Sequence, residues 1–507
     1  MATDLSTAGA TTKGIGIPAA WTEAAIVLAV AVTPIALAPL LHSVSFYLAI
    51  AVLSLFACGV VVVIPAYALV VAIVGLLFQN IFVSLWSPML DPAAVELIKG
   101  YNFLVCAVMW LATFGLFILG QRDRSPSTVR LMRISSIALG TVLLYFVLGA
   151  LENPMAATIY LRNIVLPIFL FQLALLTTAS LELRIKPALI AVAIVFILCG
   201  YIELTFRDFW LDVTHGYSYW RFDELKATDS GVWEREMRRT GAVAVDLKDR
   251  FKFGFLNTPL LDGLGLSEIL RIFGPNISAI SYGYGVAFFA LFLLSVDRPL
   301  MAVISLPLLV LCSVKGALIL LLFVGVGWLA TRLIGPVLTL TLGLVALVLY
   351  ILAGVYVGLN IGDYHVLGFM GGINGFLQAP WGRGLGIGGN LSEGFDAIDW
   401  SAAQQAGSVN GAVESAVGVL LYQMGVAALV PLSFYFYVAM RAWRLYAYSG
   451  IASQGMVAFG ICAILANGVF QEEALFAPPA LGLLVCLSGI ILGASVRAEN
   501  LAREALG

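Results

Sequence analysis

Long uninterrupted runs of apolar residues, separated by short polar connections, recur along the whole chain. Each run approaches the roughly 20 residues that a helix needs to cross about 30 Å of hydrocarbon. Membrane β-barrels instead require short segments of alternating apolar and polar residues, which is not this pattern. The pattern predicts an all-α polytopic membrane protein of about 14 transmembrane helices, forming one transmembrane domain over residues 1–507. We place the spans at 23–41, 44–63, 65–86, 101–120, 134–151, 163–181, 187–204, 277–296, 299–314, 316–331, 336–357, 416–438, 455–470 and 476–495.

The composition supports a lipid environment and narrows the chemistry. The chain is 61% hydrophobic and 11% charged, whereas a soluble domain carries about 25% charged residues. The net charge of -2 does not indicate a nucleic-acid partner. All six cysteines lie within apolar runs, which is typical of small core residues. The three histidines are scattered, so we expect neither a metal site nor a cofactor.

The distribution of basic residues predicts the orientation of the spans. With the N-terminus in the cytoplasm, thirteen Lys and Arg residues fall on the cytoplasmic side, and only four fall in short outer segments. Both termini are therefore expected inside. The long outer segment 205–275 carries ten more basic residues, which the rule does not count.

Two outer segments are too long to be simple connections. The segment 205–275 is polar and aromatic and contains Trp220 and Arg221, whereas 358–415 is rich in glycine and contains His365. Long segments of this kind are usually functional. We expect them to form two large loops with an enzyme or receptor surface, the alternative being a linker.

Four basic residues at the outer face are candidates for ligand binding. Arg162, Arg271, Lys315 and Arg383 each lie where a cation is costly unless something uses it. The simpler alternative is an interfacial side chain that extends to water. Arginine matches phosphate oxygens in a bidentate manner, and lysine supplies a point charge. Together the four predict a phosphate-bearing ligand.

A glycine motif and one glutamate are two further candidates for function. Gly384-x-Gly386-x-x-Gly389 formally fits a dinucleotide motif, but no strand–turn–helix unit surrounds it, so we predict a flexible turn. Glu414 directly precedes an apolar run, where it is either an acid favoured by the helix dipole or a general base. Burial would raise its pKa and nearby cations would lower it, so the net direction stays open.

Four stretches, in order, resemble the O-antigen ligase and polysaccharide polymerase superfamily, the Wzy- and WaaL-like proteins. They are Arg162 beside a span, Arg271-x-Phe273-Gly274-Pro275 before a span, Ser313-Val314-Lys315-Gly316 between short spans, and Ala379–Gly386 ahead of Glu414-Ser415-x9-Gly425. Ligases of this family have histidine where Glu414 stands, and the family often has Ser-Arg where this chain has Ser313-x-Lys315. The glutamate favours a polymerase over a lipid A-core ligase.

The resemblance implies a metal-independent, GT-C-like glycosyltransferase of the bacterial inner membrane with a periplasmic active site. It would transfer a glycan, with inversion, from an undecaprenyl-diphosphate carrier to a second lipid-linked glycan. A polysaccharide co-polymerase would be a candidate partner. Glu414 would take the acceptor proton, and Arg162, Arg271 and Lys315 would neutralise the leaving diphosphate. Substrate contacts would come from Arg383, Trp220, Arg221 and His365.

Three alternatives remain open. An O-antigen ligase would pass the glycan to another acceptor such as lipid A-core. A lipid-linked oligosaccharide flippase would place charges near the bilayer midplane, where only Lys315 is a candidate. A non-enzymatic assembly protein is the third.

Overall fold

The computed structural model describes residues 19–229, 252–253, 269–392, 395 and 398–506. The regular structure there is helical apart from one short antiparallel strand pair. The helices are α1 (Ala19–Val44), α2 (Phe46–Val63), α3 (Ala68–Trp86), α4 (Pro92–Ile118), α5 (Pro126–Ala150), α6 (Pro154–Ser180), α7 (Lys186–Thr205), α8 (Arg207–Val213), α9 (Gly216–Asp229), α11 (Ala279–Ser295), α12 (Pro299–Cys312), α13 (Lys315–Ile334), α14 (Pro336–Ile361), α15 (Tyr364–Gln378), α16 (Trp400–Ala406), α17 (Ala416–Met424), α18 (Leu429–Ser449), α19 (Ala452–Asn467), α20 (Glu472–Phe476) and α21 (Pro478–Glu504). The strands are β1 (Lys252–Phe253) and β2 (Ile269–Leu270).

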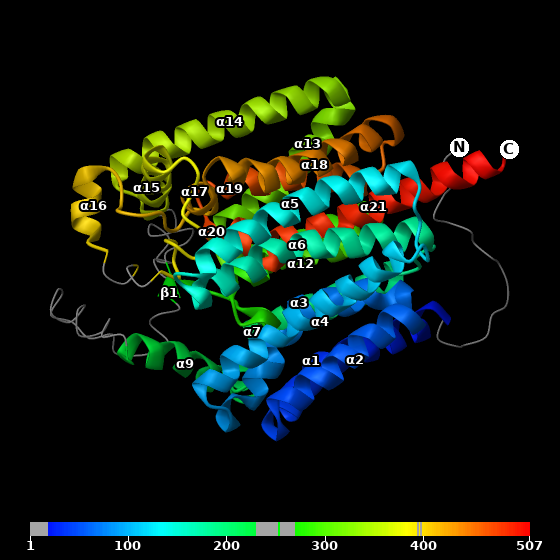
Figure 1. Ribbon diagram of the computed structural model, residues 1–507, viewed down its shortest axis with the longest axis horizontal. Coiled ribbons are helices and arrows are strands. Elements are labelled where there is room, and N and C mark those ends of the chain that lie inside the picture. Colours follow the sequence, from blue (N-terminus) through cyan, green and yellow to red (C-terminus); the bar gives the residue numbers. More distant parts are fainter. Residues whose placement is uncertain (1–18, 230–251, 254–268, 393–394, 396–397, 507) are drawn as a thin grey trace.

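The apolar runs form the predicted kind of element. Within the described part of the chain, eleven helical segments are long and apolar enough to cross a membrane. Three shorter apolar helices accompany them, namely α11, α12 and α19. The long helices run side by side along one direction (Figure 1). The chain is therefore built as a multi-pass membrane protein.

The centre of the bundle is the pair α6 and α21. Both helices are 78% buried in their most apolar stretch, whereas α14 is only 11% buried. Glycines let the central pair approach closely, because a Cβ at Gly493 would come within 2.1 Å of Thr178 Oγ1. Since α14 is apolar yet exposed, it has the surface of a lipid-facing helix.

Three helices begin about two turns earlier than the apolar runs predict. Asp91, Ser125 and Asn153 each cap a helix by accepting a hydrogen bond from the backbone, and each is followed by proline at the first helical position. These signals lie outside the apolar runs, which is why the runs alone miss them. As a result Arg162 lies inside α6 and not at its start.

The two long outer segments also contain regular structure. Residues 205–275 include α8, α9 and the β1–β2 pair, whereas 230–251 and 254–268 lie outside the described residues. Residues 358–415 include the end of α14, all of α15 and all of α16. Residues 364–378 of this second segment form the helix α15 and not an irregular loop. Their many glycines obscure the helical pattern in the sequence.

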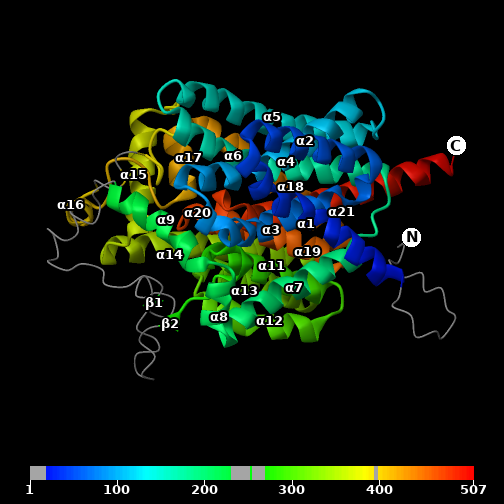
Figure 2. The same ribbon diagram turned by 90° about the horizontal axis from the view of Figure 1, so that it is seen from below.

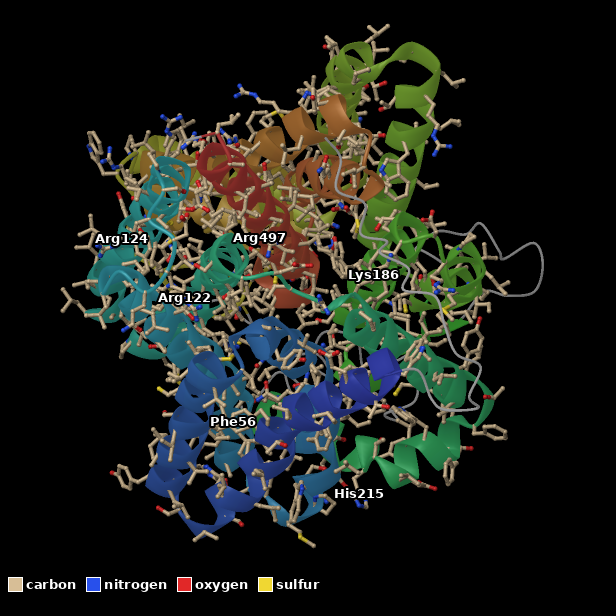
Figure 3. All side chains as sticks on the ribbon, turned by 90° about the vertical axis from the view of Figure 1, so that its right-hand side faces the viewer. Phe56, Arg122, Arg124, Lys186, His215 and Arg497 are labelled. Carbon is tan, nitrogen blue, oxygen red and sulfur yellow. The ribbon has the colours of Figure 1, made fainter. Side chains whose placement is uncertain are left out.

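The bundle has two distinct ends. Figures 1 and 2 place α9, α15, α16, α17 and α20 together at one end, which we call the α20 end. The start of α1 and the C-terminal part of α21 lie at the other end. Figure 3 looks onto that opposite end, which carries Arg122, Arg124, Lys186 and Arg497, four of the residues predicted to face the cytoplasm.

Candidate functional site

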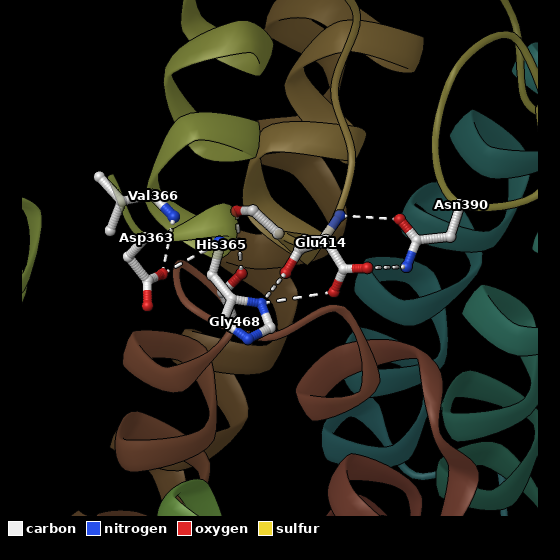
Figure 4. A network of polar contacts seen from close by, with 7 residues as sticks. Asp363, His365, Val366, Asn390, Glu414 and Gly468 are labelled. Carbon is white, nitrogen blue, oxygen red and sulfur yellow. Dashed lines mark hydrogen bonds and ion pairs between the residues drawn. The ribbon is translucent and has the colours of Figure 1, made fainter. Parts of the chain in front are cut away.

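Glu414 lies at the α20 end, immediately before α17. Ser415 caps this helix by accepting a hydrogen bond of 3.1 Å from the Gly418 N–H. The backbone of Glu414 has a φ of 60°, a left-handed conformation that costs a non-glycine residue about 1–3 kcal/mol. Asn390 holds it at two points, accepting from the Glu414 N–H at 2.8 Å and donating to its Oε1 at 3.2 Å (Figure 4). The fold thus holds Glu414 in a backbone conformation that is unfavourable for glutamate.

His365 meets Glu414 from a segment 49 residues earlier in the chain. Asp363 caps α15 and accepts from the His365 N–H at 3.0 Å, which fixes the histidine at the start of the helix. The His365 Nδ1 lies 3.1 Å from the carbonyl oxygen of Glu414 and 3.4 Å from its Oε2 (Figure 4). The His365 side chain is 40% exposed and that of Glu414 is 23% exposed. The pair is therefore accessible to a ligand.

Burial raises the pKa of Glu414 above the ordinary value for a glutamate. The His365 charge and the hydrogen bond from Asn390 act in the opposite direction, and the charge of Glu473 reinforces the increase. The direction of the Glu414 pKa shift, which the sequence left open, is therefore upward. A carboxylate with a raised pKa is a better proton acceptor near neutral pH.

Two acids of α20, Glu472 and Glu473, lie close enough to interact electrostatically with Glu414 or with each other, and neither was predicted from the sequence. Glu472 is only 7% exposed, and its Oε1 accepts a hydrogen bond of 2.7 Å from the Tyr160 hydroxyl. Glu473 acts electrostatically on both Glu414 and Glu472. The available signal was two adjacent acids in the brief connection between the predicted spans 455–470 and 476–495.

Arg271 and Lys315 approach the same region through the start of α13. The Nη2 of Arg271 donates a hydrogen bond of 3.0 Å to the carbonyl oxygen of Ser313, another residue with left-handed backbone (φ 53°). Burial lowers the pKa of Arg271, and the charge of Glu473 acts to raise it. Lys315 is the exposed first residue of α13, two positions after Ser313.

The start of α13 packs directly on the chain that leads into α20. The Nδ2 of Asn467 donates to the Gly316 carbonyl at 2.9 Å, and the Tyr284 hydroxyl donates to Gln471 Oε1 at 2.8 Å. A Cβ at Gly316 would lie 2.7 Å from Gln471 Oε1. Two of the predicted cations, Arg271 and Lys315, therefore share one neighbourhood with the acids of α20.

Arg162 belongs to a different neighbourhood. Tyr160 faces Glu472, and two residues along a helix correspond to about 200° of rotation, so Arg162 points away from that side. Its Nε donates to Asn163 Oδ1 at 3.2 Å, and its charge interacts with Glu96 of α4. Glu96 also forms an ion pair of 3.2 Å with Lys99. Arg162 thus faces α4 and is separated from the group around Glu414.

Arg383 is engaged within the fold. Its Nη1 donates to the carbonyl oxygens of Gly375 and Tyr422 at 3.0 and 3.3 Å, and the guanidinium lies 4.0 Å from the centre of the Tyr422 ring. The glycine-rich loop that it anchors packs tightly, because a Cβ at Gly389 would come within 2.0 Å of Tyr160 Oη. The flexible turn expected at Gly384-x-Gly386-x-x-Gly389 is instead a closely packed loop that positions Asn390.

Trp220 and Arg221 differ in exposure. Trp220 is 6% exposed, and its ring packs edge-on against Phe273 at 4.9 Å between centroids. It supports the segment that carries Arg271 and presents no open face on which a sugar could stack. Arg221 is exposed at the surface of α9.

Comparison with known proteins adds no assignment. No protein-family model matches the chain, and no curated protein matches it. The described residues contain no group of three or more His, Cys, Asp or Glu side chains that could hold a metal ion.

Proposed function

We propose that this protein is a bacterial polysaccharide polymerase that joins lipid-linked glycans. It would take a glycan from an undecaprenyl-diphosphate carrier and transfer it to a second lipid-linked glycan. The α20 end would face the periplasm from the inner membrane. The observation that carries the proposal is the position of Glu414 at this end, in contact with His365 and Asn390 and in one neighbourhood with the α20 acids, Arg271 and Lys315.

The proposed reaction needs a base beside the acceptor hydroxyl and basic side chains beside the leaving diphosphate. Glu414 accepts the proton of the acceptor hydroxyl as its oxygen attacks the anomeric carbon of the donor sugar. The bond from that carbon to the diphosphate oxygen breaks, and its electrons leave with the diphosphate. Arg271 and Lys315 stabilise the charge that grows there. In-line attack inverts the anomeric centre, and no step requires a metal.

The remaining predicted residues take supporting roles in this proposal. Arg162 contacts a carrier diphosphate on the α4 side of α6. His365 orients the Glu414 carboxylate through Nδ1, which leaves Nε2 directed to the substrate. Arg383 holds the loop that carries Asn390.

One observation favours a ligase as the second candidate. The related ligases have histidine at the position of Glu414, and His365 brings an imidazole against that position from elsewhere in the chain. The two candidates differ in acceptor. A ligase would extend a lipid A-core acceptor, whereas a polymerase would lengthen the lipid-linked glycan itself.

The test is reconstitution of the purified protein in liposomes. The probes are extracted undecaprenyl-diphosphate-linked repeat units, supplied alone or with lipid A-core. We expect a ladder of longer lipid-linked products from repeat units alone. Products on lipid A-core only would assign a ligase. No glycan transfer to either acceptor, by a protein that remains folded, would reject both assignments.

A further inference from the structure

Glu472 is a buried acid whose surroundings do not suit a negative charge. It is the first residue of α20 and only 7% exposed. Its Oε1 accepts from the Tyr160 hydroxyl, while its Oε2 is fully buried and has no hydrogen-bond partner among the described residues. An ionised carboxylate left in this state is far more costly than a neutral one, because the desolvation of a charge exceeds that of a polar group.

The groups that face Glu472 are acids or neutral dipoles. Tyr160 faces it from α6, Glu414 from the residues before α17, and Glu473 from α20 itself, with the backbone of Asn390 completing the surroundings. In the described part of the chain no Lys, Arg or His forms an ion pair with it. The nearest charges therefore oppose ionisation of Glu472.

We infer that Glu472 is a neutral carboxylic acid in the working protein, and that its proton limits the negative charge around Glu414 so that Glu414 can ionise. Carboxyl groups that interact strongly titrate as a set, since ionisation of one favours the protonated form of the next. Glu472 is in this sense a positioning residue. The first half of the inference stands by itself, and the second half rests on the proposed function.

The pKa agrees with this geometry. Burial raises the pKa of Glu472 to about 8, and the charges of Glu473 and Glu414 add to the increase. Hydrogen bonds from the Tyr160 hydroxyl and from the backbone of Asn390 act in the opposite direction. A carboxyl whose pKa is higher in the folded than in the unfolded state stabilises the fold at low pH. That stabilisation is lost as the pH rises from about 4.5, near the unfolded value, to about 8.

The direct test is infrared difference spectroscopy of the protein in liposomes between acidic and alkaline pH. We expect a protonated-carboxyl band that persists at neutral pH, disappears as the pH rises through about 8, and is absent from Glu472→Gln. The matched control is Glu473→Gln, the same change one residue along α20, which should keep the band. A band unchanged in Glu472→Gln, or lost already near pH 5, would overturn the inference.

The thermal midpoint gives a second readout that needs no substrate. The wild-type midpoint should fall across this same pH range, and the fall should be smaller in Glu472→Gln, which cannot ionise. Equal pH dependence of the two proteins would contradict a neutral Glu472.

Polymer formation then tests the role toward Glu414. Wild-type activity should change as the pH rises through about 8, where Glu472 ionises and places a further negative charge beside Glu414. Glu472→Gln should lack that change, because glutamine imitates the protonated acid at every pH. The same change in Glu472→Gln would refute the role toward Glu414. If no polymer forms at any pH while the infrared band behaves as expected, the proposed function fails and the neutral Glu472 stands.

Discussion

Glu203, in the last turn of α7, and Glu414, just before α17, are both acids near a helix end, yet their surroundings differ. Glu203, near the end of α7, is completely buried and accepts from the N–H groups of Phe273 and Gly274 at 2.6–3.1 Å. It also forms an ion pair of 3.2 Å with Arg207. Glu414 keeps 23% of its side chain exposed.

The partners explain the difference. Glu203 pairs with Arg207 at the start of α8 and accepts from the N–H groups of Phe273 and Gly274. Its charge therefore ties two segments, α8 and the chain before α11, to the end of α7. Glu414 is held by Asn390 and His365 in a left-handed conformation that the backbone disfavours. A fully paired acid stabilises the fold, whereas a strained and partly exposed one is available for chemistry. The two residues should therefore fail in different ways when they are altered.

The largest stability effect should come from Glu203→Ala. The change leaves Arg207 and two buried N–H groups without their acceptor, which costs about 3–5 kcal/mol when a buried ion pair is broken. Thermal unfolding in detergent, followed by intrinsic fluorescence, measures the loss. Glu203→Gln keeps an acceptor and should lose about 1.5–3 kcal/mol, the contribution of a hydrogen bond to a charged group. An unchanged midpoint in Glu203→Ala would end the distinction between the two acids.

Glu414→Gln should lower activity strongly and stability little, the opposite of Glu203→Ala. Removing a general base lowers the rate about 10²–10⁴-fold, while the amide can still accept from Asn390 and so the midpoint should barely move. Initial rates of polymer formation measure the effect. Because burial raises the pKa of Glu414, wild-type activity should rise with pH over a range above 4.5, the ordinary glutamate value. A variant that polymerises normally would reduce Glu414 to a helix-start acid.

Removing the basic side chain of Arg271 or Lys315 should lower the rate less than Glu414→Gln does. Arg271→Ala and Lys315→Ala each remove a charge-assisted contact to the diphosphate, and such contacts contribute about 1.5–3 kcal/mol, or about 10–100-fold in rate. Lys315→Arg keeps the charge and should retain part of the activity. The assay is the same polymer ladder at saturating donor. Full activity of both alanine variants would place the diphosphate site elsewhere, for example beside Arg162.

The sequence predicted apolar helices along the chain but placed several helix starts wrongly, for a physical reason. Burial in lipid requires apolar runs, which are visible directly, whereas helix starts depend on local pairs such as Asn153-Pro154 that lie outside the runs. The close packing of the loop around Gly389 depends on Tyr160, which is distant in sequence. Contacts of this kind cannot be read from spacing.

The candidate site was predicted in part. Glu414 and His365 were both named, but their contact joins segments 49 residues apart and appears only in the folded chain. Glu472 was missed because two acids between spans resemble a solvated connection, and the tertiary packing of α6 and α17 buries it. Trp220 shows the converse error, since an aromatic residue in a polar segment suggests a sugar platform although Phe273 covers its ring.

Arg383→Lys should have the smallest effect. It decides whether Arg383 stabilises the fold, as Glu203 does, or acts on the substrate, as proposed for Glu414. Lysine lacks the planar guanidinium that stacks on the Tyr422 ring while its Nη1 donates to two carbonyls, so we expect a loss of about 1 kcal/mol in stability. The apparent KM for lipid-linked donor should stay within about twofold, since the charge is already engaged by the fold. Tyr422→Leu is the matched control, because it removes the stacked ring and leaves the arginine in place. It should lower the thermal midpoint by a similar amount. If Arg383→Lys instead raises KM about tenfold and leaves the midpoint unchanged, Arg383 contacts the substrate as the sequence predicts, and a second phosphate contact lies on the loop that carries Asn390.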